Sequence, residues 1–139
     1  MKLSVLSMSQ AHYYIPSGKS AIIRITDGGF DFNELAHTYD NKLELSFYDI
    51  EPRVGLPSNW NWFNKKDGQE IIDFFSGILD YDELVIHCHA GVSRSPAIAL
   101  SYGWFTDNDE IVEQIKNGGY IPNRHVLEVM SRLIFEDRR

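Results

Sequence analysis

The chain of 139 residues has little cysteine, no excess of positive charge and no long apolar run. A single cysteine cannot form an internal disulfide, which excludes a fold held together by such bridges. The net charge of −7 argues against a nucleic-acid partner, because no basic stripe is present to neutralise a phosphate backbone. No segment approaches the length of a membrane span, and the stretch after Lys2 is too short for a signal peptide.

Apolar residues are nevertheless plentiful. Hydrophobic residues make up 43% of the chain and aromatic residues 13%, which is enough to build one hydrophobic core. We therefore predict a single domain over residues 1–139.

Hydrophobic periodicity predicts strands that alternate with helices. Strands are expected at Leu3–Met8, Ala21–Ile25, Lys42–Tyr48 and Leu84–His87. Helices are expected from Asp67 to about Leu79, from about Ser93 to Phe105, from Asp107 or Asn108 to Lys116, and from Asn123 onward, with one possible turn within Asn33–Tyr39. This order predicts an α/β fold with a small, largely parallel central sheet of four to five strands and helices on both sides.

The most informative segment is His87–Pro96, which reads HCHAGVSRSP. It places the only cysteine, Cys88, between a predicted central strand and a predicted helix that begins near Arg94. Backbone N–H groups of such a loop and the helix dipole attract an anion, and an arginine adds a two-pronged contact to phosphate oxygens. The same positive field favours the thiolate form of Cys88, so one arrangement binds a phosphate and activates a nucleophile.

Two other interpretations of this segment are less specific. Cys88 could be a small buried hydrophobic residue, which is the usual role of a free cysteine. Alternatively, His87, Cys88 and His89 could bind a metal, although adjacent residues rarely aim at one ion and no second ligand cluster is evident. Neither interpretation explains a glycine at position 91 and an arginine at position 94.

The segment resembles the signature of the Cys-x5-Arg phosphatases, the protein tyrosine phosphatase superfamily, in its dual-specificity form His-Cys-x-x-Gly-x-Ser-Arg-Ser. Every fixed position matches: His87, Cys88, Gly91, Ser93, Arg94 and Ser95. Leu45–Ile50 resembles the strand and aspartate before the acid loop of that family, and Ile121–Asn123 its Pro-Asn segment. The Trp-Pro-Asp acid loop and the phosphotyrosine-recognition loop of the tyrosine-specific enzymes are absent from the sequence, so the chain resembles a compact member.

The resemblance implies a role for each residue of the site. Cys88 would attack phosphorus, and Ser95 would donate a hydrogen bond to the departing thiolate. Arg94 and the loop N–H groups would bind the phosphate; the loop residues are His89, Ala90, Gly91, Val92 and Ser93. His87 and Asn123 would support the loop from outside. No metal and no cofactor is expected.

A proton donor for the leaving oxygen must come from outside the loop. Asp49 is the first candidate, because it follows a strand and begins a loop over residues 49–66 that is long enough to close over substrate. Glu51 and Asp67 are the alternatives.

The expected activity is hydrolysis of phosphomonoesters, on phosphotyrosine or with dual specificity. The alternatives are the same chemistry on a phosphoinositide, an RNA 5′ end or a small metabolite, and a pseudophosphatase that binds a phosphoprotein. The phosphorylated substrate is the only partner expected, without nucleic acid or membrane, and the oligomeric state stays open. A reactive thiol needs reducing surroundings, so a cytoplasmic location is expected.

Overall fold

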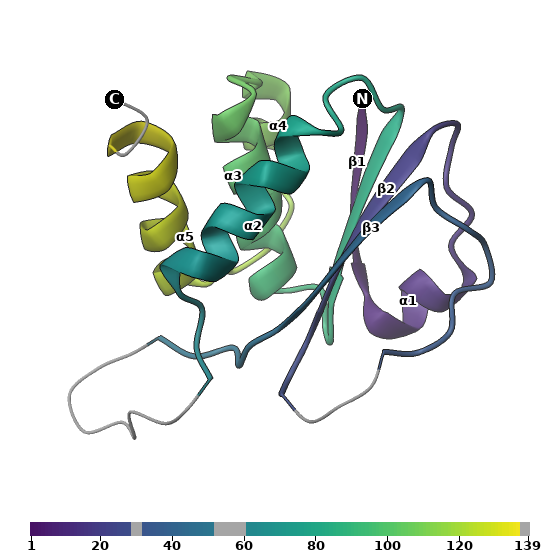
Figure 1. The fold of residues 1–139 in the computed structure, drawn as a ribbon, viewed down its shortest axis with the longest axis horizontal. Coiled ribbons are helices and arrows are strands. Elements are labelled where there is room, and N and C mark those ends of the chain that lie inside the picture. The colour runs from purple at the N-terminus through teal and green to yellow at the C-terminus, as the bar shows by residue number, and fades with distance from the viewer. Residues whose placement is uncertain (29–31, 52–60, 137–139) are drawn as a thin grey trace.

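The computed structural model describes residues 1–28, 32–51 and 61–136, which form one sheet with helices packed against it (Figure 1). The strands are β1 (Lys2–Ser7), β2 (Ser20–Thr26), β3 (Asn41–Ser46) and β4 (Glu83–Cys88). The helices are α1 (Met8–Tyr13), α2 (Lys65–Ser76), α3 (Arg94–Phe105), α4 (Asp109–Lys116) and α5 (Arg124–Ser131), followed by the π-helical turn η1 (Arg132–Glu136).

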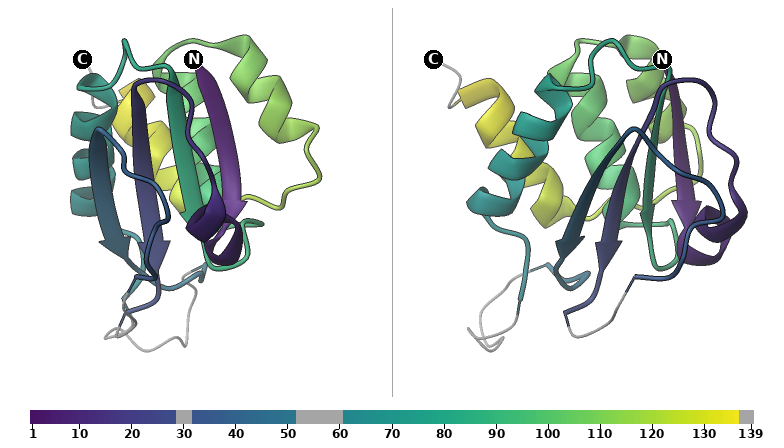
Figure 2. Two further views of the ribbon diagram at one scale, coloured as in Figure 1. Left: turned by 90° about the vertical axis from the view of Figure 1, so that its right-hand side faces the viewer. Right: turned by 45° about the vertical axis from the view of Figure 1, so that its right-hand side comes forward.

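The four strands are all parallel and lie in the order β1-β4-β2-β3. Helices α2 to α5 cover one face of the sheet, and the short helix α1 lies on the other side (Figures 1 and 2). The predicted α/β fold with a small parallel sheet is therefore confirmed. Because the strands are parallel, their carboxyl ends all meet at one edge, and residues following β1, β2, β3 and β4 come together there.

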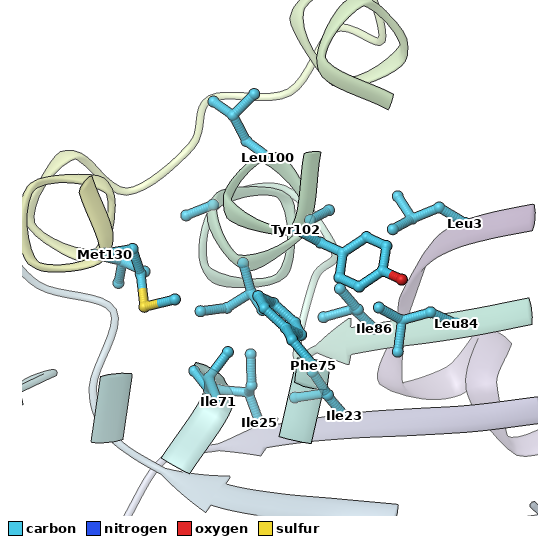
Figure 3. Close-up of a cluster of buried hydrophobic side chains, with 14 of the residues drawn as sticks. Leu3, Ile23, Ile25, Ile71, Phe75, Leu84, Ile86, Leu100, Tyr102 and Met130 are labelled. Carbon is cyan, nitrogen blue, oxygen red and sulfur yellow. The ribbon is translucent and has the colours of Figure 1, made fainter. Parts of the chain in front are cut away.

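The core lies between the sheet and helices α2 to α5. Alternate strand residues such as Ile23 and Ile86 point toward Ile71 and Phe75 of α2 and Met130 of α5 (Figure 3). Each of these five side chains is completely buried. Ile71 and Phe75 of α2 lie four residues apart, which is the spacing that places both on one face of a helix and turns that face to the core.

The opposite face of the sheet is also buried, but it carries polar side chains. Glu83 has no exposed surface, and its carboxylate accepts hydrogen bonds from the Ser4 and Tyr14 hydroxyls and from the Ser17 N–H. Arg24 and His87 lie on the same face and are likewise buried. Buried polar groups of this kind are tolerated when they satisfy one another.

Some predicted boundaries were wrong. Helix α2 is capped by Asn64, not by Asp67; Asp67 is the third helical residue and returns a bond to the Asn64 N–H in a capping box. The predicted turn within Asn33–Tyr39 is not helical. Helix α1 was not predicted, although Ser7 and Gln10 form its capping box.

The predicted long loop over residues 49–66 lies partly outside the described residues, which omit positions 52–60. Among the helices that the structure describes, none has the length and apolar character needed to span a bilayer.

Candidate active site

The loop between β4 and α3 is shaped by Gly91. This residue has φ of +74°, in the left-handed region that glycine adopts without strain. A Cβ atom there would lie 2.8–2.9 Å from backbone atoms of Leu6 and Ser7 at the end of β1. Only glycine lets the loop pass this close to the neighbouring strand.

Cys88 ends β4 at the base of this loop, with only 2% of its surface exposed. Its Sγ accepts a hydrogen bond of 3.2 Å from the Gly91 N–H and lies 3.1 Å from the Ser95 hydroxyl. A thiolate sulfur can only accept, so on a Cys88 thiolate the Gly91 N–H and the Ser95 hydroxyl would both be donors. A cysteine that only filled the core would need neither donor.

Arg94 is the first residue of α3, and its side chain is hydrogen-bonded to residues that follow two other strands. Its Nη1 donates to the Asp27 carboxylate at 2.7 Å and to the Phe47 carbonyl at 2.8 Å, just beyond β2 and β3. The guanidinium is almost fully buried, yet its Nε has no acceptor among the described residues. A buried donor of a charged group without a partner is costly, so an anion that accepted from this Nε would be stabilised.

The first turn of α3 is also open to an anion. Ser93 occupies the N-cap position, but its side chain makes no capping hydrogen bond; its hydroxyl donates to Asp49. Within the described parts of the chain, the N–H groups of Ala90, Val92 and Ser93 likewise have no acceptor. Helix N-termini with free N–H groups are common phosphate sites.

Asp49 lies at the edge of the loop. Its Oδ1 accepts from the Ser93 hydroxyl at 2.8 Å and from the Asn123 side-chain amide at 2.9 Å. Asn123 also donates its backbone N–H to the Ser93 carbonyl and caps α5 through the Val126 N–H. Asn123 therefore ties the aspartate, the loop and α5 together, and leaves Asp49 Oδ2 without a partner among the described residues.

The two alternative acids are engaged elsewhere. Glu51 accepts from the Arg124 N–H at 3.0 Å at the start of α5. Asp67 accepts from the Asn64 N–H in the capping box of α2, and burial raises the pKa of its carboxyl. Both carboxylates thus accept hydrogen bonds from backbone N–H groups at the start of a helix.

The three neighbouring residues His87, Cys88 and His89 do not converge. His87 is buried on the opposite face of the sheet, where its ring contacts Arg24, whereas His89 is exposed. No group of three potential metal-ligating side chains occurs among the described residues.

Comparison with models of protein families gives no match. Among curated proteins, the chain is 24% identical over 152 residues to the tyrosine-protein phosphatase yvh1 of Schizosaccharomyces pombe. This alignment covers 96% of the present chain but 42% of that relative, so the chain spans less than half of the relative's length.

Solved structures with a similar fold include the human tyrosine phosphatase-like serine/threonine/tyrosine-interacting protein, with a TM-score of 0.55 at 18% identity over 84% of this chain and 76% of that one. A mouse putative dual specificity phosphatase complexed with zinc tungstate has a TM-score of 0.54 at 11% identity, and the match covers 91% of this chain and 72% of that one. PTPMT1 in complex with PI(5)P has a TM-score of 0.53 at 19% identity, and the match covers 84% of this chain and 76% of that one. The chain has the fold of the dual-specificity phosphatases.

Within this fold, two residues at the site were not predicted from the sequence. Asp27 reads as part of a polar turn, although its position just after a buried strand places it at the same edge as Cys88. Arg24 is the single charged residue in the apolar sequence of β2. This interruption was the feature of the sequence that could have indicated a buried charge with a specific partner. In both cases the partner residue lies more than sixty positions away in the chain.

Proposed function

We propose that the chain is a phosphomonoester hydrolase of the protein-tyrosine or dual-specificity type, acting through a cysteinyl-phosphate intermediate. One observation carries the proposal. Cys88 Sγ accepts a hydrogen bond from the Gly91 N–H and lies 3.1 Å from the Ser95 hydroxyl, at the base of a loop whose buried Arg94 Nε and backbone N–H groups have no acceptor among the described residues. A nucleophilic sulfur surrounded by unpaired donors is the arrangement that phosphoryl transfer to cysteine requires.

The reaction proceeds in two steps. The Cys88 thiolate attacks phosphorus, the S–P bond forms, the P–O bond to the leaving group breaks, and Asp49 gives the leaving oxygen its proton from Oδ2. Water then attacks the cysteinyl-phosphate, Asp49 takes its proton, and the S–P bond breaks to release phosphate. Ser95 donates a hydrogen bond to the returning thiolate, while Arg94 and the loop N–H groups hold the equatorial oxygens throughout.

The surroundings of the loop favour a protein substrate. Three exposed apolar residues lie in the loop or next to residues that contact it: Val92 is part of the loop, Ile121 is hydrogen-bonded to it, and Tyr48 precedes Asp49 in the chain. The Ile121 N–H donates to the Val92 carbonyl, so these two lie side by side. An apolar border suits the ring of phosphotyrosine and its peptide neighbours, whereas a polyanionic headgroup would meet no added lysine in the loop and a net charge of −7.

The alternatives remain other phosphate esters, and a pseudophosphatase that binds without turnover. PTPMT1, solved with PI(5)P, has the same fold at 19% identity, which keeps phosphoinositides among the compounds to test. A cytoplasmic location is part of the proposal, since a thiolate nucleophile must stay reduced.

The first prediction is that the purified chain hydrolyses para-nitrophenyl phosphate in the presence of a chelator. Among natural substrates, a phosphotyrosine peptide should give the highest kcat/KM, ahead of phosphoserine and phosphothreonine peptides and of phosphoinositide vesicles. Malachite green detection of phosphate measures all of them on one scale. Preference for the vesicles would favour the lipid alternative, and tight peptide binding without turnover would favour the pseudophosphatase.

The second prediction concerns Asp49. Asp49→Asn should lower kcat/KM on phosphotyrosine peptide by roughly 10²–10⁴-fold, because the leaving oxygen then departs without a proton. The loss should be smaller for leaving groups that depart unprotonated, and the alkaline limb of the pH–rate profile should flatten. Glu51→Gln is the matched control and should leave both the rate and the alkaline limb close to wild type. If the alkaline limb persisted in Asp49→Asn but vanished in Glu51→Gln or Asp67→Asn, the role would pass to that residue.

A further inference from the structure

Arg24 is a buried cation on the face of the sheet opposite the helices. It lies in the middle of β2, directly beside His87 of β4 in the register of the two strands, and 4% of its surface is exposed. Burying a guanidinium is costly unless its donors are satisfied. Here Nε donates to His87 at 3.0 Å, Nη2 donates to both oxygens of Asn33 at 2.5 and 2.6 Å, and Nη1 lies 3.5 Å from Glu44.

The bond to His87 fixes the state of the imidazole ring. Since Arg24 can only donate, His87 Nε2 must accept, and the ring proton is on Nδ1. Burial and the Arg24 charge lower the pKa of His87 to about 4, so the ring is neutral near pH 7. The Nδ1 proton then faces the Cys88 carbonyl, whose oxygen lies 3.4 Å from Nδ1.

The bond to Asn33 reaches the same loop by a second route. The Asn33 side-chain amide donates to the Met8 carbonyl at 3.1 Å, and the Met8 N–H donates to the His89 carbonyl at 3.1 Å. Arg24 is thus linked to two successive carbonyl groups, those of Cys88 and His89, which are the first two of the loop.

The direction of these carbonyls sets the direction of the N–H groups that follow. In a planar trans peptide the C=O and the next N–H point in opposite directions. With the Cys88 and His89 carbonyls drawn toward His87 and Met8, the N–H groups of His89 and Ala90 point away from those two residues. Among the described residues, the Ala90 N–H has no acceptor there.

We propose that Arg24 is a positioning residue for the phosphate loop, which acts through His87 and Asn33 to orient the first N–H groups of the oxyanion site. This inference rests on the proposed function, because it assigns those N–H groups to a phosphate. It adds to that function a residue that touches neither substrate nor Cys88.

The test is Arg24→Met, which keeps the length of the side chain and removes every donor. We expect kcat on para-nitrophenyl phosphate to fall by roughly 10–100-fold, with KM changed by less than about threefold, because oriented N–H groups act mainly on the transition state. Vanadate, an oxyanion probe that needs no turnover, should bind about tenfold more weakly or worse, measured by protection of Cys88 from iodoacetamide. Lys42→Met is the matched control, since Lys42 also pairs with Glu44 but does not contact His87, and it should behave as wild type.

A spectroscopic measurement separates positioning from a general loss of structure. Nitrogen-15 spectra of the His87 ring at pH 7 should show the Nδ1–H tautomer in the wild type and in Lys42→Met, and a mixture of tautomers in Arg24→Met. If Arg24→Met fails to fold, Arg24→Gln retains one donor to His87 and should preserve the tautomer with a smaller loss of kcat. The double variant Arg24→Met/His87→Asn should be barely slower than the slower single variant, because the two residues act in series.

Other results would overturn the proposal. Wild-type kcat and vanadate affinity in a folded Arg24→Met, an unchanged His87 tautomer, or fully additive losses in the double variant would each do so. If the wild type hydrolysed no phosphate ester, the proposed function would fail, while the tautomer and the vanadate affinity would still decide the role of Arg24.

Discussion

Cys88→Ser is expected to lower the turnover of para-nitrophenyl phosphate by on the order of 10⁴-fold or more without unfolding the protein. A serine hydroxyl is much less acidic than a thiol, so the Gly91 N–H and the Ser95 hydroxyl, at 3.2 and 3.1 Å from Sγ, would not hold it as an anion. The oxygen atom fits where the sulfur lies, and Arg94 and the loop N–H groups remain. Substrate binding should therefore survive the loss of the reaction.

This separation of binding from turnover is directly measurable. The variant should retain phosphotyrosine peptide in equilibrium binding and should show the same thermal unfolding midpoint as the wild type to within a few degrees. Because the sequence contains one cysteine, iodoacetamide modifies only Cys88, and phosphate should protect the wild type from inactivation. A serine variant with activity within about tenfold of wild type, or an alkylated wild type that keeps full activity, would rule out the cysteine mechanism.

Arg94→Lys is expected to lower kcat/KM by roughly 10²–10³-fold although the positive charge is retained. Lysine carries its three donors on one nitrogen, whereas arginine spreads five over a planar fork. In the structure, Nη1 is already occupied by Asp27 and the Phe47 carbonyl, which leaves Nε as a buried donor without an acceptor among the described residues. An ammonium group would have to meet both Asp27 and the phosphate from one nitrogen, without the planar fork of arginine.

The control for this prediction is Arg132→Lys, since Arg132 is exposed and pairs only with Glu128 among the described residues. That exchange should change neither activity nor stability measurably, because exposed ion pairs contribute little. Inhibition by vanadate reports oxyanion binding in both variants. If Arg94→Lys stayed within about threefold of wild type, the fork would contribute less than roughly 1 kcal/mol and the proposed contact would be wrong.

Much of the site could be predicted because its central part is contiguous. The segment His87–Pro96 contains the end of a strand, a tight loop and the start of a helix, and each was readable from neighbouring residues. Asp49 was also a prediction from position, since it follows β3 and parallel strands end at one edge. Its contacts with Ser93 and Asn123 place it there, and its role stays a proposal.

What the amino-acid sequence determined by itself was the fold class, the apolar faces of the helices and the loop around Cys88, because these depend on residues a few positions apart. Tertiary structure alone decided the partners of the charged groups. Asp27 meets Arg94 and Arg24 meets His87 only because β2 and β4 are neighbours in a parallel sheet, with one particular register. A single turn aspartate or a single strand arginine carries no local sign of such a partner, since the energy that fixes the pairing comes from burial of the whole sheet.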